Sequence, residues 1–223
     1  MANCFLLNKM KVYELKKQNL NKFVLACHRI GVHGLLQCSS GNLSWRLAEE
    51  DRVAITTKGA WLGELDESEI ALCRISDGQC LNDRKPSVEA EMHLGIHRIR
   101  KEVNVVLHFQ SPCATAIACS QPEKVDFFVI PEVPVYIGPI GIVDYKIPGT
   151  QDLATAATAV MKNHNLALLK SHGLIAVGRT FDEVIQNAAF FELACEIILK
   201  GQDVHALSRD ALDELKKTYG YTL

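Results

Sequence analysis

Two histidines lie where short apolar segments of the sequence end. His108 follows Val105-Val106-Leu107, and Gln110 stands two residues further on, so on a strand the two side chains point to the same side. His172 lies just beyond a second apolar segment, residues 166–169. Imidazoles at the ends of two strands are a plausible start for a zinc site, but a histidine there can also cap its strand through a backbone contact. The spacing alone leaves both interpretations open.

A carboxylate near the start of a predicted helix is a third candidate. Pro86-Ser87 is a typical helix start, which places Glu89 close to the positive end of the helix dipole. The same carboxylate suits a metal ligand or a general base, because proton abstraction next to a carbonyl group needs a positioned carboxylate. Glu91 and His93 lie close by, and the residue types do not choose among the three.

Two glycine-containing turns supply a candidate phosphate site. The first is Ser39-Ser40-Gly41-Asn42, and the second is Thr57-Lys58-Gly59. Small residues with free backbone N–H groups, beside a lysine, suit a phosphate group. Clusters of this composition are also ordinary turns, so both interpretations stand at this point.

The order of the predicted helices and strands indicates how these residues are positioned. Apolar residues recur at helical spacing over residues 11–33, and the capping box Thr180-Phe181-Asp182-Glu183 opens a long helix. Further helices are predicted at residues 86–99, 112–119, 152–163 and 208–217. Strands are predicted at residues 43–46, 53–57, 70–75, 105–109, 127–130, 133–137, 142–147, 166–169 and 173–177. We therefore expect a single α/β domain, residues 1–223, with a central mixed, largely antiparallel sheet covered by helices.

Composition excludes several classes of protein. The 24 Lys and Arg residues nearly balance the 26 Asp and Glu residues, and a net charge of −2 gives no basic field for nucleic acid or an anionic membrane. No apolar run approaches the ~18 residues that span a membrane, and the N-terminus has too few apolar residues for a signal peptide. The eight cysteines form no C-x-x-C pair, so we expect reduced thiols and a cytoplasmic location.

Five short motifs share their order and spacing with the class II aldolase/adducin family. They are Ser40-Gly-Asn-Leu-Ser44, Ile55-Thr-Thr-Lys-Gly59, Pro86-Ser-Val-Glu89, Val106-Leu-His-Phe-Gln110 and Ser171-His-Gly-Leu174. The sequence resembles members of this family over nearly its whole length.

The resemblance implies a zinc-dependent lyase that acts on a sugar phosphate. Family members are α/β domains that form cyclic homotetramers with active sites at the subunit interfaces. By position, Glu89 is implied as a metal ligand and the acid/base group, and His108 and His172 as two of three metal-binding histidines. Tyr219 matches a tyrosine of the C-terminal tail that acts on the aldehyde half of the substrate. The phosphate-binding positions are occupied by Gly41, Asn42, Lys58, Gly59, Ser87 and Val88.

Several departures from the family pattern bear on the site. Gln110 stands at the position of the third histidine. Its carbonyl oxygen is a harder and weaker zinc ligand than imidazole, so Mn²⁺ or another divalent ion is possible in place of Zn²⁺. Val88 replaces a serine, and Lys58 replaces a threonine, at the phosphate-binding positions. The interface tyrosine expected near residues 127–130 has no counterpart in Phe127-Phe128-Val129-Ile130.

The reaction implied by the resemblance is cleavage of a ketose 1-phosphate similar to L-fuculose 1-phosphate. Its products are dihydroxyacetone phosphate and a short aldehyde. Epimerisation, dehydration and decarboxylation of a sugar phosphate are alternatives, because all of them use a metal-bound enolate. A non-catalytic, adducin-like interaction module is a further alternative, which Gln110 favours and the retained Glu89, His108 and His172 oppose.

Overall fold

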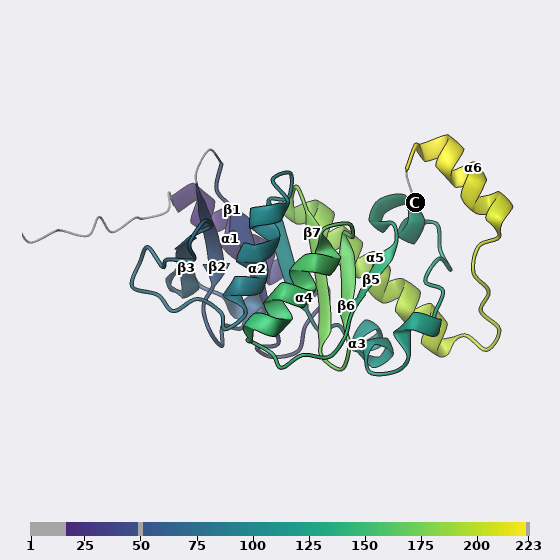
Figure 1. Ribbon diagram of the computed structural model, residues 1–223, viewed down its shortest axis with the longest axis horizontal. Coiled ribbons are helices and arrows are strands. Elements are labelled where there is room, and N and C mark those ends of the chain that lie inside the picture. The colour runs from purple at the N-terminus through teal and green to yellow at the C-terminus, as the bar shows by residue number, and fades with distance from the viewer. Residues whose placement is uncertain (1–16, 49–50, 222–223) are drawn as a thin grey trace, which may run out of the picture.

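The computed structural model describes residues 17–48 and 51–221, and its centre is a seven-stranded mixed sheet (Figure 1). The strands are β1 (Gly41–Arg46), β2 (Arg52–Thr56), β3 (Ile70–Arg74), β4 (Val105–Phe109), β5 (Ile140–Val143), β6 (Leu166–Leu169) and β7 (Gly173–Gly178). Their order across the sheet is β3-β2-β1-β4-β7-β6-β5. Neighbouring strands are antiparallel except β5 and β6, which are parallel. The predicted fold class is confirmed.

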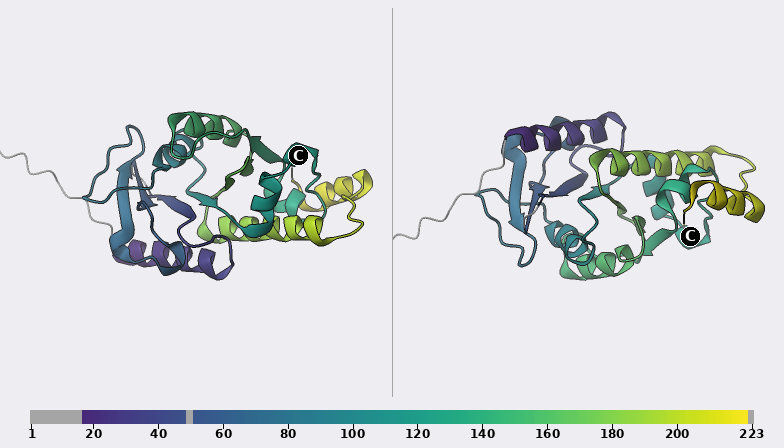
Figure 2. Two further views of the ribbon diagram at one scale, coloured as in Figure 1. Left: turned by 90° about the horizontal axis from the view of Figure 1, so that it is seen from below. Right: turned by 90° about the horizontal axis from the view of Figure 1, so that it is seen from above.

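Helices cover both faces of this sheet (Figure 2). On one face lie α1 (Lys17–Val32), α3 (Pro112–Ala118) and α5 (Phe181–Lys200). On the other lie α2 (Ala90–Ile99) and α4 (Gln151–Met161), which pack against each other. The last helix, α6 (Arg209–Tyr219), follows α5, buries no residue and lies at the opposite end of the molecule from β3 in Figure 1. Among the described residues, no helix has the length and apolar character needed to cross a bilayer.

Strand β4 shows how alternating side chains sort the core. Leu107 and Phe109 belong to the apolar cluster beneath α1 and α5, and Val106 belongs to the cluster beneath α2 and α4. His108 alternates with its neighbours and therefore faces the side of α2 and α4. Because every residue of β4 is buried, His108 is a polar group inside an otherwise apolar strand.

Strand β1 has the same alternation, with polar residues on one side. Leu43 packs into the cluster beneath α1 and α5. Asn42 lies opposite His108, and Ser44 lies opposite Val106, so both polar side chains face α2. Both are buried, and buried polar groups need hydrogen-bond partners. Helix α2 must therefore present polar side chains to β1.

Two of the predicted strands are wrong, and a third is displaced. Residues 127–130 pass through a turn, and Val133–Ile137 is a π-helix in which Gly138 N–H donates to Val133 C=O. A short apolar run has no period that separates a strand from a buried helical turn, and Pro134 lacks the N–H that a strand ladder needs. The strand predicted at residues 142–147 is β5, Ile140–Val143.

The helices predicted at residues 86–99 and 11–33 correspond to α2 and α1. The helix predicted from residue 86 begins at Ala90. Residues 86–88 instead extend along β2, where Ser87 N–H donates to Thr56 C=O. Glu89 is thus the N-cap residue of α2. The helix predicted over residues 11–33 is α1, and the predicted part before Lys17 lies outside the described residues.

Candidate metal centre

Glu89, His108 and His172 meet where β4 ends, next to the N-terminus of α2 and the turn between β6 and β7. One ligand atom of each lies within 4.8 Å of the other two. His108 Nε2 is 3.3 Å from Glu89 Oε2, and His172 Nε2 is 3.5 Å from Glu89 Oε1. The Glu89 and His108 side chains are buried, and that of His172 is 9% exposed. We call these three residues the metal cluster.

The local backbone explains how His172 reaches the other two. Ser171 has φ of +55°, a left-handed conformation that is uncommon for a residue with a side chain and that clusters at functional sites. The turn is fixed because Ser171 N–H donates to Ala118 C=O and His172 N–H donates to Leu169 C=O. A Cβ atom on Gly173 would lie 2.7 Å from the carbonyl oxygen of Phe109. Glycine therefore lets β7 begin close enough to β4 to bring the two imidazoles together.

The protonation of His108 suits a metal ligand. Its Nδ1 lies 2.8 Å from Leu174 C=O, so Nδ1 carries the hydrogen and donates it to that carbonyl. The lone pair of Nε2 is then directed toward Glu89. Proteins commonly orient a ligating imidazole through such a backbone carbonyl behind the ring.

The metal cluster has the composition and spacing of a divalent cation site. Glu89 Oε1 has no hydrogen-bond partner in the described part of the chain, although buried polar atoms are rarely left unpaired. Two imidazole nitrogens and one carboxylate oxygen match the donors of catalytic zinc sites, which keep a further position open. Tetrahedral zinc bonds of about 2.1 Å separate ligand atoms by about 3.4 Å. Each histidine lies at about this distance from one Glu89 oxygen, His108 at 3.3 Å from Oε2 and His172 at 3.5 Å from Oε1. The residues present fit the ion.

Burial and neighbouring groups set the ionisation of the metal cluster. Burial by itself raises the pKa of Glu89, but His108, the hydrogen bond from Asn42 and His172 lower it, and the net pKa is below its usual value. Burial, with the adjacent His108, lowers the pKa of His172 to about 4. At neutral pH an ionised carboxylate therefore faces a neutral His172. These are the protonation states that bind a cation.

The two predicted phosphate-binding turns have different neighbours in the structure. The turn at residues 57–59 lies beside residues 85–87, because Lys58 N–H donates to Lys85 C=O. Ser87 Oγ accepts a hydrogen bond from Glu89 N–H. The structure thus brings Ser87 next to Glu89 and the turn of Lys58 and Gly59 beside the segment that leads to it. Phosphate binding by these three residues stays a prediction.

Asn42 contacts the metal cluster itself. Its Nδ2 donates to Glu89 Oε2 at 3.0 Å, and its Oδ1 accepts a hydrogen bond from His93 Nε2. The amide nitrogen and oxygen of Asn42 are thus both hydrogen-bonded within the protein. The direct contact of Asn42 with phosphate, predicted from the sequence, also stays a prediction. Gly41 has φ of +135°, and a Cβ there would lie 2.8 Å from His108 C=O. Glycine is required at this position for the close pairing of β1 and β4.

Gln110 and Tyr219 differ in their surroundings: Gln110 lies beside His108, and Tyr219 is exposed. A Cβ on Gly173 would meet Gln110 Cγ at 2.8 Å and His108 Cε1 at 3.3 Å, so these two side chains border the same point. Tyr219, at the end of α6, is 62% exposed. No hydrogen bond or ring contact joins it to the metal cluster within the residues described. The catalytic role of Tyr219 stays a prediction.

We expect Gln110→His to tighten zinc binding by roughly 10- to 100-fold, the range by which a perturbed coordination environment changes metal affinity. The reason is that imidazole is a better zinc ligand than an amide oxygen. The dissociation constants of both proteins are measured by titration with zinc against a competing chelator. Gln79→His, in the exposed turn after β3, is the control. Equal affinities of the Gln110→His variant and the wild type would show that residue 110 does not face the ion.

Sequence reasoning left His93 unassigned and did not consider Ser44 and His97 as part of the site. All three are buried behind Asn42, and Ser44 Oγ lies 2.8 Å from His93 Nδ1 and 2.9 Å from His97 Nε2. The signal in the sequence was the spacing of Glu89, His93 and His97, four residues apart, because such residues share one face of a helix.

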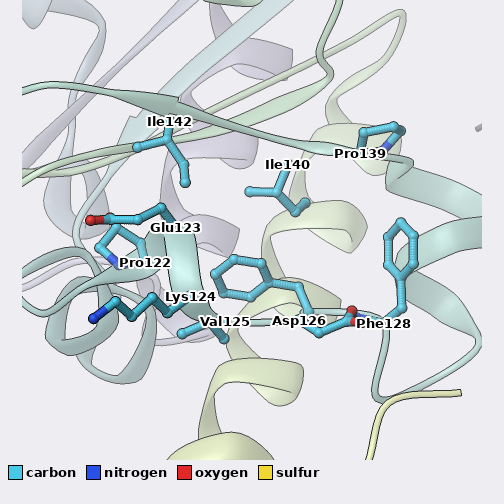
Figure 3. Close-up of a pocket in the computed structure, with 10 residues that line it drawn as sticks. Pro122, Glu123, Lys124, Val125, Asp126, Phe128, Pro139, Ile140 and Ile142 are labelled. Atoms are coloured by element: carbon cyan, nitrogen blue, oxygen red, sulfur yellow. The ribbon is translucent and has the colours of Figure 1, made fainter.

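Two hollows in the surface differ in their relation to the metal cluster. One, of about 500 Å³, lies beside the edge strand β5, and Figure 3 shows Ile140 and Ile142 pointing into it opposite Pro122. None of its lining residues belongs to the metal cluster. A smaller hollow of about 100 Å³ is lined by Glu89, with Val88 and Gly149. Of the metal cluster, only Glu89 borders the smaller hollow.

Comparison with known families identifies the family to which the chain belongs. Residues 21–199 match the family model described as Class II Aldolase and Adducin N-terminal domain. The chain belongs to this family. The predictions of the family and of a lyase that acts on a sugar phosphate are thereby confirmed.

Relatives of this chain are named for more than one reaction. It is 33% identical over 177 residues to the L-fuculose phosphate aldolase of Methanococcus vannielii, covering 79% of this chain and 93% of the relative. It is 26% identical over 182 residues to the 3-oxo-tetronate 4-phosphate decarboxylase of Haemophilus influenzae, covering 79% and 86% of the two chains. A solved structure of L-fuculose 1-phosphate aldolase superimposes with a TM-score of 0.82 at 21% identity, covering 93% of this chain and 98% of the other. This last likeness establishes the fold.

Proposed function

We propose that this class II aldolase cleaves a ketose 1-phosphate, similar to L-fuculose 1-phosphate, into dihydroxyacetone phosphate and a short aldehyde. The observation that carries the proposal is the buried metal cluster, in which Glu89 keeps one carboxylate oxygen unpaired. The similarity to an aldolase of L-fuculose phosphate supports the choice of substrate.

Glu89, His108 and His172 would hold the metal ion, and their donor atoms favour Zn²⁺. A divalent cation bound there acts as a Lewis acid toward the carbonyl and hydroxyl oxygens of the substrate. Gln110 is placed to border the same site, and its amide oxygen makes a harder ion such as Mn²⁺ the alternative.

Glu89 is the acid/base group in this proposal. Its pKa is below the usual value, so at neutral pH it is ionised and able to accept a proton. When the C3–C4 bond breaks, the C4 hydroxyl loses its proton as the aldehyde forms and C3 gains one, and Glu89 would deliver that proton to C3. Asn42 holds Oε2, while Oε1 has no hydrogen-bond partner among the described residues. Because the carboxylate is buried, it can return the proton to carbon without exchange with bulk water.

The substrate phosphate is held away from the bond that breaks. Gly41, Lys58, Gly59 and Ser87 lie around the first residues of β1 and the N-terminus of α2, and Lys58 is exposed and carries a positive charge there. Binding at a non-reacting group orients the substrate over Glu89.

For Lys58→Ala we expect KM for the phosphorylated ketose to rise about tenfold, with a smaller change in kcat. The reason is that binding realised equally in the ground and transition states changes KM and leaves kcat. Steady-state kinetics on the wild type and the variant measure both. Lys101→Ala, at the far end of α2, is the charge-matched control. Failure of inorganic phosphate to compete with the substrate would contradict phosphate binding at this turn.

A coupled assay for dihydroxyacetone phosphate tests the proposed reaction. Purified enzyme is supplied with zinc and a panel of ketose 1-phosphates, and aldehyde release is followed in parallel. Formation of both products, lost on treatment with a chelator and restored by zinc, is the expected result. Absence of either product across the panel would reject the aldolase reaction.

Decarboxylation of a 3-oxo-tetronate 4-phosphate is the second candidate. The observation that favours it is the similarity to the decarboxylase of Haemophilus influenzae over most of both chains. Both reactions need an electron-withdrawing cation next to a carbonyl group, which the metal cluster suits equally. Release of carbon dioxide from that substrate, without dihydroxyacetone phosphate, would identify this activity.

We also propose a cytoplasmic homotetramer with active sites at the subunit interfaces. The exposed position of Tyr219, at the end of a helix that buries no residue, supports a site shared between copies. The seven described cysteines are all free thiols, which supports a reducing compartment. Light scattering of the purified protein measures the oligomeric state, and a monomeric mass would contradict this assembly.

A further inference from the structure

A continuous line of buried hydrogen bonds runs from Glu89 along the interface between β1 and α2. Asn42 and Ser44 come from β1, and His93 and His97 come from α2. Each of the four side chains is buried, and the two histidines are fully so. We call Asn42, His93, Ser44 and His97 the β1–α2 hydrogen-bond chain.

The two elements have matching spacings. Alternate residues of a strand, such as Asn42 and Ser44, lie about 6.8 Å apart. Residues four apart on a helix, such as His93 and His97, advance about 6.0 Å. Polar groups of β1 and α2 can therefore interleave along the interface, and Glu89, one helical turn before His93, comes next in the same row.

The partners fix the direction of each hydrogen bond. The carboxylate of Glu89 can only accept, so Asn42 turns Nδ2 toward it and Oδ1 toward His93. His93 must then carry its hydrogen on Nε2. Its Nδ1 accepts from the hydroxyl of Ser44, and Ser44 Oγ accepts from His97 Nε2. Every donor in the chain thus points toward Glu89.

The hydrogen bond from His93 Nε2 to Asn42 Oδ1 is available to the neutral and to the protonated ring, since Nε2 donates in both. The bond from Ser44 to His93 Nδ1 forms only with the neutral ring. A protonated His93 would donate from both nitrogens and reverse the bond to Ser44. Burial, followed by the nearby His97 and His108, lowers the pKa of His93 to about 3, and burial with Arg46 does the same for His97. His97 Nδ1 ends the chain with no partner among the described residues.

We infer that His93 is a positioning residue of this enzyme: it locks the amide of Asn42 so that Nδ2 holds Glu89 Oε2 and leaves Oε1 for the metal ion. The inference rests on the proposed function in one respect, namely that Glu89 is a metal ligand. Without the hydrogen bond from His93, the Asn42 amide is free to rotate by half a turn. Its oxygen would then face the carboxylate, and Glu89 would move away from His108 and His172.

The test compares His93→Leu with His93→Gln. Leucine cannot donate to Asn42 Oδ1, whereas the amide of glutamine can. We expect His93→Leu to weaken zinc binding about 10- to 100-fold, as for other groups that orient metal ligands, and to change the visible absorption spectrum of the Co²⁺-loaded protein. His93→Gln should stay within about threefold of the wild type and keep its Co²⁺ spectrum, since the donor that orients the ligand is retained.

His28→Leu is the matched control. His28, on α1, makes a single hydrogen bond to Leu65 C=O and does not belong to the β1–α2 hydrogen-bond chain. It should lower the melting temperature without changing zinc affinity. If His93→Leu does not fold, Ser44→Ala replaces it. That variant removes the donor to His93 Nδ1 with little change in volume, and it should weaken zinc binding several-fold.

Two results would overturn the inference. One is wild-type zinc affinity and Co²⁺ spectrum in the folded His93→Leu variant, or in Ser44→Ala where that is used. The other is an equal loss in His93→Gln and His93→Leu, which indicates a purely structural role. The protein could also cleave no ketose 1-phosphate while its zinc affinity depends on His93. That result would reject the aldolase reaction but support the inference.

Discussion

Glu89→Gln is expected to lower kcat at saturating zinc by at least ~100-fold, the range typical of general acid/base groups. The amide is close in shape to the carboxylate but cannot accept and deliver the proton that C3 gains on cleavage. In the wild type the low pKa of Glu89 keeps an anion facing His108 and His172, and the substitution replaces that anion by a neutral group. Single-turnover kinetics with zinc-saturated protein measure the loss, and circular dichroism verifies the fold.

Glu91→Gln is the matched control for this substitution. Glu91 lies two residues further along, in the first turn of α2, but its carboxylate is exposed and pairs with Arg98. Its removal should leave kcat within about twofold of the wild type, as is usual for exposed ion pairs. Turnover of Glu89→Gln at the wild-type rate would remove Glu89 from the mechanism.

The two histidines of the metal cluster could be predicted from the sequence because they stand at the ends of strands. The apolar run before His108 predicts a buried strand, and β4 spans the predicted residues. The run before His172 does the same for β6. Alternation along β4 then determines the face on which His108 lies. These signals are local, and they do not depend on tertiary contacts.

The partners of Glu89 could not be predicted in this way. The composition of the turn predicts that Asn42 binds phosphate, but it gives no information about which element packs against the turn. Its contact with Glu89 depends on how β1 and α2 pack together, across 47 residues of sequence. His93 likewise acquires its role from Ser44 on another element. Tertiary packing, not residue type, assigns these side chains.

The segment around Val133–Ile137 shows the opposite difficulty. Its valines and isoleucine have high strand propensity, yet the segment closes as a π-helix against α5 and α6. Propensity for a strand reflects how a side chain fits a half-buried sheet, and here the sheet already ends at β5. The segment does not join the sheet, and a helical turn buries its apolar side chains Val133, Pro134 and Ile137.

His108→Ala is expected to weaken zinc binding by at least ~100-fold, the upper end of what loss of a group orienting a metal ligand costs, and to abolish turnover at micromolar zinc. His108 supplies one of three donors, and its ring is held in place by the hydrogen bond from Nδ1 to Leu174 C=O. Without the imidazole, Glu89 loses the closest of its two neighbouring ligand atoms, at 3.3 Å. Competition with a chromogenic chelator measures the affinity.

The control is His164→Ala, which removes a half-buried imidazole after α4 whose Nδ1 hydrogen-bonds within its own segment, to Val160 C=O. It should keep zinc affinity and turnover. Excess zinc should restore part of the activity of His108→Ala, because Glu89 and His172 remain as donors and mass action offsets a weaker site. Wild-type zinc affinity in His108→Ala would instead place the metal ion elsewhere. Loss of activity that excess zinc does not restore, in a variant that binds zinc stoichiometrically, would assign His108 to the chemistry and not to the metal.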